Sequence, residues 1–168
     1  NHAIKNGCSE IILSLGGSAT NDAGAGIFQA LGGELLDEKN EQIGRGCESL
    51  IKVKQIKTPK YLNNIKFQIA YDVSNPLLGI NGATKTYSSQ KGATLDQIEK
   101  LEKNIFHFSH VVKKDLKIDI TKVEGGGSAG GTAAGLYGLL GAELTNGFKL
   151  IAELVNLERK VELSDIIF

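Results

Sequence analysis

The chain has 168 residues, which is long enough for one domain with a substantial core. Its 19 basic and 19 acidic side chains cancel, which argues against a general nucleic-acid or membrane surface but leaves room for a local basic pocket. A hydrophobic content of 41% and a charged content of 23% are typical of a soluble globular protein. Aromatic residues are sparse and tryptophan is absent, so platforms for base stacking are not expected.

The two cysteines, Cys8 and Cys47, lie in no Cys-x-x-Cys pattern and have no metal-ligating neighbours. We therefore expect two reduced, partly buried thiols in a cytoplasmic protein. No segment approaches the roughly 20 apolar residues of a membrane span, and no signal peptide is recognised. Methionine is absent, and residues 165–168 resemble the start of a buried strand. Both features predict that residues 1–168 are a single domain of a longer protein.

Apolar periodicity in the first half of the chain predicts short strands and one helix. The predicted strands are 11–15, a small hairpin of 34–37 with 42–44, the alternating segment 49–56, and 65–71. The helix covers 22–31, with Ile27, Phe28 and Leu31 as its apolar contacts, and the two glycines that follow end it. The last of these strands delivers Asp72 at its carboxyl end.

The second half contains the clearest helix, from Thr94 to about residue 114, because Thr94 and Gln97 have capping-box spacing. Its apolar stripe comprises Leu95, Ile98, Leu101, Ile105, Phe108 and Val112. A second helix follows the glycine-rich residues 125–131. A third covers 147–157, and its core-facing side chains are Phe148, Ile151, Leu154 and Val155. Alternating strands and helices predict an α/β domain whose mixed sheet is flanked by helices.

Three segments combine glycines with hydroxyl, amide and charged side chains. The first is 16–26, the second is 72–79 with 82–84 and 90–93, and the third is 125–131. Glycines at such junctions let the backbone turn sharply and approach a ligand closely. Ligands of α/β sheets bind beyond the carboxyl ends of the strands, so we expect the fold to gather all three segments around one small-molecule cleft.

Three charged side chains in these segments each allow two interpretations. Asp72 could bind Mg²⁺ or accept a proton from a hydroxyl group, or it could cap the turn after its strand. Asp22 is either a helix cap or a carboxylate directed at substrate. Lys91, between Gln90 and Gly92, is placed to bring its charge to a phosphate or carboxylate, which we favour over a solvated loop lysine.

The glycines of 125–131 are ambiguous in the same way. They lack the Gly-Lys-Ser/Thr ending of a P-loop and the context of a dinucleotide-binding Gly-x-Gly-x-x-Gly. Their amides could hold a phosphate or carboxylate, or the glycines could allow close packing of helix on sheet. His107 and His110 lie three apart on the long helix without a carboxylate, so we expect a half-buried helix face and no metal site.

Taken together, the three segments resemble the glycerate kinase family of the bacterial two-domain type, which is distinct from the P-loop glycerate kinases. The matching stretches run through nearly the whole chain: 16–26, 72–79 with 82–83, 90–93, 126–131 and 141–144. The resemblance implies ATP-dependent phosphorylation of D-glycerate to phosphoglycerate. It also implies that the chain is the inserted second domain of a two-domain kinase, and that it forms one part of an active site completed by the remaining domain of the parent chain.

The resemblance and the side-chain chemistry lead to a set of expected roles. The expected catalytic residues are Asp72 or Asp22, which orient the attacking hydroxyl, and Lys91, which offsets charge on the transferred phosphoryl group. Substrate binding is assigned to Ser18, Thr20, Asn21, Asn75, Gly126, Gly127 and Ser128. The cofactor-binding glycines are Gly16, Gly17 and Gly125. The expected cofactors are ATP and Mg²⁺, without a metal site built from protein ligands alone.

Three positions depart from the family pattern. Tyr71 stands where the family usually has cysteine, and Tyr87-Ser88-Ser89-Gln90 stands where it has Phe-Gly-Pro-Gln. Ala23 replaces a glycine, which is tolerable only if φ is negative there. Two other functions remain open: a non-catalytic domain that binds a small anion, and a kinase for a related hydroxy acid.

Overall fold

The computed structural model describes residues 1–167. In chain order, the elements are α1 (His2–Lys5), β1 (Glu10–Ser14), α2 (Ala25–Ala30), β2 (Glu34–Leu36), η1 (Cys47–Lys52), β3 (Gln55–Lys57), η2 (Lys60–Asn64), β4 (Lys66–Tyr71), α3 (Ala83–Tyr87), α4 (Leu95–Leu116), η3 (Ile120–Lys122), α5 (Ser128–Leu140), β5 (Glu143–Asn146), α6 (Gly147–Leu154) and α7 (Leu157–Glu162). The elements labelled η are short 3₁₀ helices.

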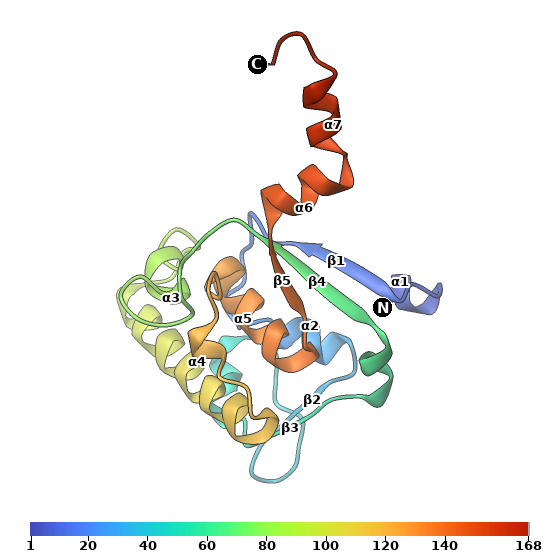
Figure 1. Cartoon of the computed structure of the whole chain (residues 1–168). Coiled ribbons are helices and arrows are strands. Elements are labelled where there is room, and N and C mark those ends of the chain that lie inside the picture. Colours follow the sequence, from blue (N-terminus) through green and yellow to red (C-terminus); the bar gives the residue numbers. More distant parts are fainter. Residues whose placement is uncertain (168) are drawn as a thin grey trace.

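Strands β1, β4 and β5 form a parallel sheet in the order β1-β4-β5 (Figure 1). The register places Ser14 opposite Ala70 and Tyr71 opposite Asn146. The strands predicted at the positions of β1 and β4 are confirmed to within one residue. Because the pairing is parallel, the carboxyl ends of all three strands meet at one edge of the sheet, which is where α/β proteins bind ligands.

A separate antiparallel ribbon pairs β2 with β3. The predicted hairpin is confirmed in part, because an antiparallel bridge joins Leu36 to Gln42 and the Ile43 N–H donates to the Leu35 carbonyl oxygen at 2.9 Å. The strand that pairs with β2 along its length is β3, which comes later in the chain. Half of the strand predicted at 49–56 lies in the helix η1, and its last two residues begin β3. The buried side chains of η1, Cys47 and Leu50, are three residues apart, which matches a helical turn and not a strand. The α/β class is confirmed, with both strand orientations present in separate sheets.

Helix α2 is shorter than the predicted range 22–31, because the residues before Ala25 cap the helix and are not part of its first turn. Phe28 and Leu31 are buried as predicted. Ile27 is 37% exposed, so its predicted core contact is wrong. Neighbouring helical residues point about 100° apart, so the full burial of Phe28 leaves Ile27 toward solvent.

Helix α4 confirms the most strongly predicted element. The Gln97 N–H donates to Thr94 Oγ1 at 3.3 Å, and the Thr94 N–H donates to Gln97 Oε1 at 2.8 Å. Most of the predicted apolar stripe is buried or half-buried. Leu95 is the exception, because it occupies the first position after the cap and lies outside the contacts that bury Ile98 and Ile105.

Helix α5 is the centre of the fold, between the parallel sheet and α4 (Figure 1). Ala133 and Leu136 pack in the cluster beneath the sheet, whereas Ala134 and Leu139 join the cluster shared with α2 and α4. Small residues let both layers approach the helix closely. Within residues 1–167, no helix combines the length and the apolar character that crossing a membrane requires.

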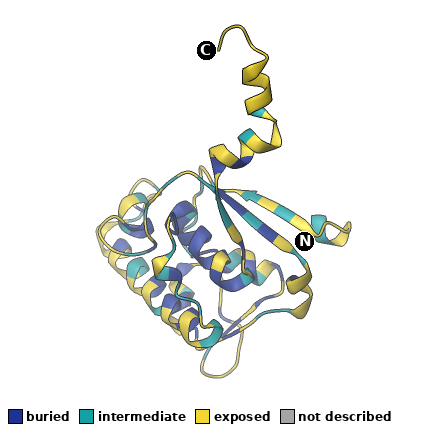
Figure 2. Cartoon of the chain, viewed as in Figure 1, coloured by how far each residue is buried: buried dark blue, intermediate teal, exposed yellow. Residues whose placement is uncertain are grey.

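The last two helices stand away from this body, and most of their surface is exposed (Figures 1 and 2). The four side chains predicted to face the core are exposed by 42% to 71%: Phe148, Ile151, Leu154 and Val155. That prediction is wrong because α6 extends away from the edge of the sheet, and the face that contains Leu150 is the one that packs against the rest of the protein. The strand predicted at 165–168 is also absent from the described residues 165–167, which are exposed and irregular, and Phe168 lies outside them.

Cys8 is exposed and Cys47 is buried, so the expected partial burial is wrong for Cys8. Burial, reinforced by the nearby negative charge of Asp22, raises the pKa of the Cys47 thiol to about 12. Thiolates are the reactive form, so iodoacetamide should label Cys8 and leave Cys47 unmodified in the native protein. Peptide mass spectrometry measures both sites, and labelling of Cys47 should appear only after denaturation. Equal labelling without denaturant would contradict this burial.

Candidate functional site

A cavity of about 180 Å³ opens at the edge of the sheet where β1 and β4 end. All three glycine-containing segments contribute to its walls. The lining residues are Leu15, Gly16, Gly17, Ser18, Val73, Tyr87, Gln90, Lys91, Ser128 and Ala129. The structure therefore brings together segments that are far apart in the sequence, as the positions of the strand ends predict.

The first segment supplies backbone donors. Gly17 adopts a φ of 58°, which glycine accepts without a steric penalty. Within residues 1–167, the N–H groups of Gly16, Gly17 and Ser18 form no backbone hydrogen bond. Because these residues line the cavity, their N–H groups are available to an anionic ligand.

Lys91 brings a positive charge to the same cavity. Its Nζ donates to the Thr20 carbonyl oxygen at 2.7 Å and to Ser18 Oγ at 3.3 Å. An ammonium group has three hydrogens, so one is left for a ligand. Burial lowers the pKa of Lys91 below its ordinary value, and the negative charge of Asp22 opposes that shift. A partly desolvated cation beside free amides favours an anion.

Asp22 is bonded within its own loop. Its Oδ1 accepts from Thr20 Oγ1 at 2.8 Å and from the Gly24 N–H at 3.0 Å. Its Oδ2 accepts from the Gly26 N–H at 3.0 Å. The carboxylate therefore satisfies two amides at the start of α2, which is the capping role that the sequence left open.

Two expected substrate ligands, Thr20 and Asn21, are not among the residues that line the cavity. Thr20 bonds Asp22 through its hydroxyl and Lys91 through its carbonyl oxygen. Asn21 Nδ2 donates to Thr84 Oγ1 at 3.2 Å, and Asn21 Oδ1 is buried without a partner among the described residues. Both side chains hold the loop in place around Lys91.

Asp72 follows β4 at the ligand-binding edge of the sheet, and it is exposed. It lies beside the backbone of Gly147, where an added Cβ would be 2.6 Å from Asp72 Oδ1. No hydrogen bond to its carboxylate is formed among residues 1–167, so it does not cap the turn. Val73, the next residue, lines the cavity, whereas Asp72 is not among the lining residues.

Asn75 is bonded between two other segments. Its Oδ1 accepts from the Tyr87 hydroxyl at 2.7 Å, and its Nδ2 donates to the Asn81 carbonyl oxygen at 2.9 Å. Its own carbonyl oxygen accepts from the Gly127 N–H at 2.8 Å. Tyr87, and not Asn75, lines the cavity. Sequence reasoning noted Tyr87 only as a departure from a family pattern, and its position shortly before Lys91 was the signal of a role.

Three amides of the expected cradle in the third segment are bonded within the protein. The N–H groups of Gly126, Gly127 and Ser128 donate to protein carbonyl oxygens at 3.1, 2.8 and 3.0 Å. The Ser128 hydroxyl is buried and donates to the Gly125 carbonyl oxygen at 2.7 Å. A Cβ on Gly127 would lie 2.5 Å from the Pro76 carbonyl oxygen. These glycines serve close packing, which was the alternative interpretation.

Left-handed residues mark the junction of the first and third segments. Ala129, Gly130 and Gly131 have φ values of 51°, 66° and 86° at the start of α5. The Gly130 carbonyl oxygen accepts from the Ala23 N–H at 3.1 Å, and Ala23 has a φ of 51°. Ala23 therefore lacks the negative φ that would make alanine readily tolerated in place of glycine. A non-glycine residue in this region costs about 1–2 kcal/mol, and such strain concentrates at functional sites.

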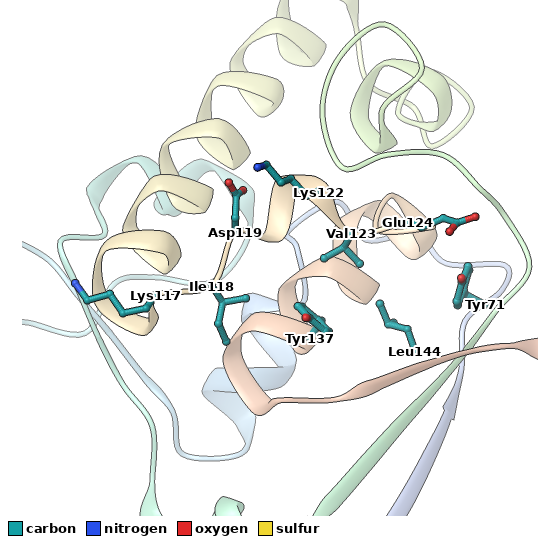
Figure 3. Close-up of a pocket in the computed structure, with 9 residues that line it drawn as sticks. All are labelled: Tyr71, Lys117, Ile118, Asp119, Lys122, Val123, Glu124, Tyr137 and Leu144. Carbon is teal, nitrogen blue, oxygen red and sulfur yellow. The ribbon is translucent and has the colours of Figure 1, made fainter.

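A larger groove of about 510 Å³ lies elsewhere, between η3, α5 and β5 (Figure 3). Tyr71, Tyr137 and Leu144 contribute to its walls, together with charged side chains. One of these, Asp119, is paired with Lys113 at 2.8 Å, and that pairing lowers the pKa of its carboxyl group. We place the candidate site in the smaller cavity, because only there do the three segments meet around free donors.

No group of three or more His, Cys, Asp or Glu side chains within residues 1–167 is arranged to hold a metal. The His107 Nε2–H donates to the Val53 carbonyl oxygen at 2.8 Å, and His110 is exposed. The two histidines therefore belong to a helix face, as predicted.

The sequence model described as the glycerate kinase family matches residues 1–168. The chain belongs to the glycerate kinase family. Glycerate 2-kinase of Escherichia coli (strain K12) is 42% identical to it over 163 residues, and glycerate kinase of Bacillus subtilis (strain 168) is 40% identical over 168 residues. The crystal structure of glycerate kinase 2 from Salmonella typhimurium LT2 superimposes on this chain with a TM-score of 0.88, and the two sequences are 39% identical.

These alignments cover most of this chain but less than half of each relative. The E. coli alignment covers 95% of this chain and 42% of the relative, and the B. subtilis alignment covers 98% and 44%. The Salmonella structure covers 94% of this chain, which in turn covers 43% of that structure. The family resemblance read from the three segments is thus confirmed, for a chain that spans under half the length of its relatives.

Proposed function

We propose that the full-length protein containing this glycerate kinase family chain is a cytoplasmic enzyme that transfers a phosphoryl group from ATP to D-glycerate. The observation that carries the proposal is the meeting of free backbone donors and the Lys91 ammonium in one cavity of about 180 Å³. That donor set suits a small organic anion, and the family supplies the reaction class.

Lys91, Ser18 and the amides of 16–18 are the groups that bind an anionic oxygen in this proposal. They would hold the carboxylate of glycerate or a phosphate oxygen. Their chemistry fits ATP, because phosphate oxygens accept from the same donors. Mg²⁺ usually binds one or two carboxylates together with phosphate oxygens, and the exposed carboxylate of Asp72 fits the protein's share. When bound, Mg-ATP supplies the phosphoryl group and neutralises part of its charge.

Asp72 is the better candidate for orienting the attacking hydroxyl. Both carboxylate oxygens of Asp22 are bonded within the α2 cap, whereas no bond to the carboxylate of Asp72 forms among the described residues. The remaining expected ligands take supporting roles: Thr20, Asn21 and Asn75 hold loops, and Gly125, Gly126, Gly127 and Ser128 allow close packing. We infer that the remaining domain of the parent chain completes the site.

The experiment incubates the full-length protein with Mg-ATP, D-glycerate and a panel of related hydroxy acids. We expect phosphoglycerate, and ³¹P NMR of the product identifies the hydroxyl that is phosphorylated. Binding of glycerate in isothermal titration without any phosphorylated product would support a non-catalytic anion-binding domain. Faster turnover of another hydroxy acid would replace glycerate as the substrate.

Asp72→Asn should lower kcat by about a hundredfold, because an amide is a poor partner for an ionising hydroxyl. Its unfolding midpoint should stay unchanged, since the carboxylate is exposed. Asp22→Asn should show the reverse pattern, with a loss of about 1 kcal/mol of stability from the damaged α2 cap and a smaller effect on turnover. Steady-state kinetics and thermal unfolding separate the two. Turnover near the wild-type value in both variants would remove the carboxylates from the mechanism.

A further inference from the structure

Tyr87 is the aromatic side chain among the residues that line the cavity, and it ends α3. We propose that Tyr87 makes the cavity selective for ligands with a hydroxyl group over ligands with a carbonyl group at the same carbon. It does so by presenting an oxygen that accepts a hydrogen bond and has no hydrogen left to donate. This inference rests on the proposed function, because it concerns the same cavity and the same class of small acid.

The protein determines the direction of the hydrogen bonds around Asn75. The Asn81 carbonyl oxygen can only accept, so the amide atom of Asn75 that lies 2.9 Å from it must be the nitrogen. The other amide atom is therefore the oxygen. That oxygen lies 2.7 Å from the Tyr87 hydroxyl, which must donate to it.

A phenol has one hydrogen, and this bond uses it. The Tyr87 oxygen keeps a lone pair, and no donor among residues 1–167 is bonded to it. A ligand hydroxyl that approaches this oxygen can donate and complete its bonding. A ligand carbonyl would place two acceptors together, and neither would be satisfied. Sites that pair a substrate hydroxyl reject analogues without it for this reason.

Other polar groups of the cavity are hydrogen-bond donors, in contrast to the acceptor at Tyr87. Lys91 and the amides of 16–18 are donors, so they suit a carboxylate. Donors at Lys91 and residues 16–18, together with an acceptor at Tyr87, match the carboxylate and the hydroxyl of a hydroxy acid. A keto acid of the same size can accept hydrogen bonds from Lys91 and the amides of 16–18, but its carbonyl group cannot donate to the Tyr87 oxygen.

The test measures binding of D-glycerate and of hydroxypyruvate, the 2-keto acid with the same carbon skeleton, to the full-length protein by isothermal titration. We expect the wild type to bind D-glycerate at least about tenfold more tightly. Tyr87→Phe should reduce that ratio about fivefold or more, chiefly by weakening glycerate. Tyr137→Phe is the matched control, because Tyr137 lies in the other groove, and its ratio should equal that of the wild type.

A second variant separates selection from mere loss of structure. Asn75→Ala keeps the ring of Tyr87 and frees its hydroxyl hydrogen, so hydroxypyruvate should bind more tightly than it does to the wild type. Hydroxypyruvate binding no more tightly to this variant than to the wild type, with the unfolding midpoint unchanged, would overturn the proposal. An unchanged ratio in Tyr87→Phe, with glycerate still bound, would also overturn it and leave the proposed function standing. Failure of the wild type to bind or phosphorylate D-glycerate would overturn both.

Discussion

Replacing Lys91 by methionine should lower kcat/KM for D-glycerate about a thousandfold in the full-length protein and leave its fold intact. The ammonium is the positive charge at the cavity, and it bonds the Thr20 carbonyl oxygen at 2.7 Å. Methionine keeps an unbranched side chain of similar length but provides no donor. Because the site is partly desolvated, no solvent cation replaces the lost charge at low cost.

The control is Lys103→Met, an exposed position on α4 outside the cavity, which should keep wild-type kinetics. Steady-state kinetics measure both variants, and circular dichroism confirms that both are folded. Wild-type kinetics in Lys91→Met would show that anion binding depends on groups elsewhere in the parent protein.

The same lysine predicts a dependence on pH. Its pKa is lowered by burial, so it loses its proton at a lower pH than an ordinary lysine. Affinity for glycerate should therefore be complete below that lowered pKa and should fall as pH rises through it. Titrations of glycerate binding should show this decline in the wild type and not in Lys91→Met.

Replacing Gly135 by alanine should destabilise the protein by at least about 2 kcal/mol and lower its unfolding midpoint by about 4 °C or more. Two effects oppose each other here. Alanine is favoured over glycine in a helix by about 1 kcal/mol. The new Cβ, however, would collide with the carbonyl oxygen of Ala23, which is backbone and cannot rotate away. The collision dominates, because relieving it requires α5 to move from the first segment.

Gly16→Ala is the matched control for this stability measurement. Its Cβ would meet nothing within 4 Å, and its φ lies outside the left-handed range, so the unfolding midpoint should barely change. Urea or thermal unfolding of the full-length protein measures both variants. If Gly135→Ala unfolded at or above the wild-type midpoint, α5 and the first segment would not be packed as tightly as the structure indicates.

The elements that were predicted well have signals within a few neighbouring residues. The alternation of β4 and the capping box of Thr94 are local patterns, and the structure confirms both. The predicted faces of α6 were wrong for the opposite reason, as was the strand expected at 165–168, which is absent from the described residues 165–167. An apolar stripe does not reveal which surface lies opposite it, and here Phe148 and Ile151 face away from the described body.

The sequence by itself determined the α/β class, the family, and the three segments that meet at the cavity. These depend on residue types in a given order along the chain. Only the tertiary structure decided which groups in those segments are available to a ligand. The amides of 126–128 and the carboxylate of Asp22 form hydrogen bonds within the protein. The amides of 16–18 form no backbone hydrogen bond among the described residues. The physical reason is that a backbone amide is free or engaged according to partners distant in sequence, such as Asn75 for Gly127, and only folding brings those partners within reach.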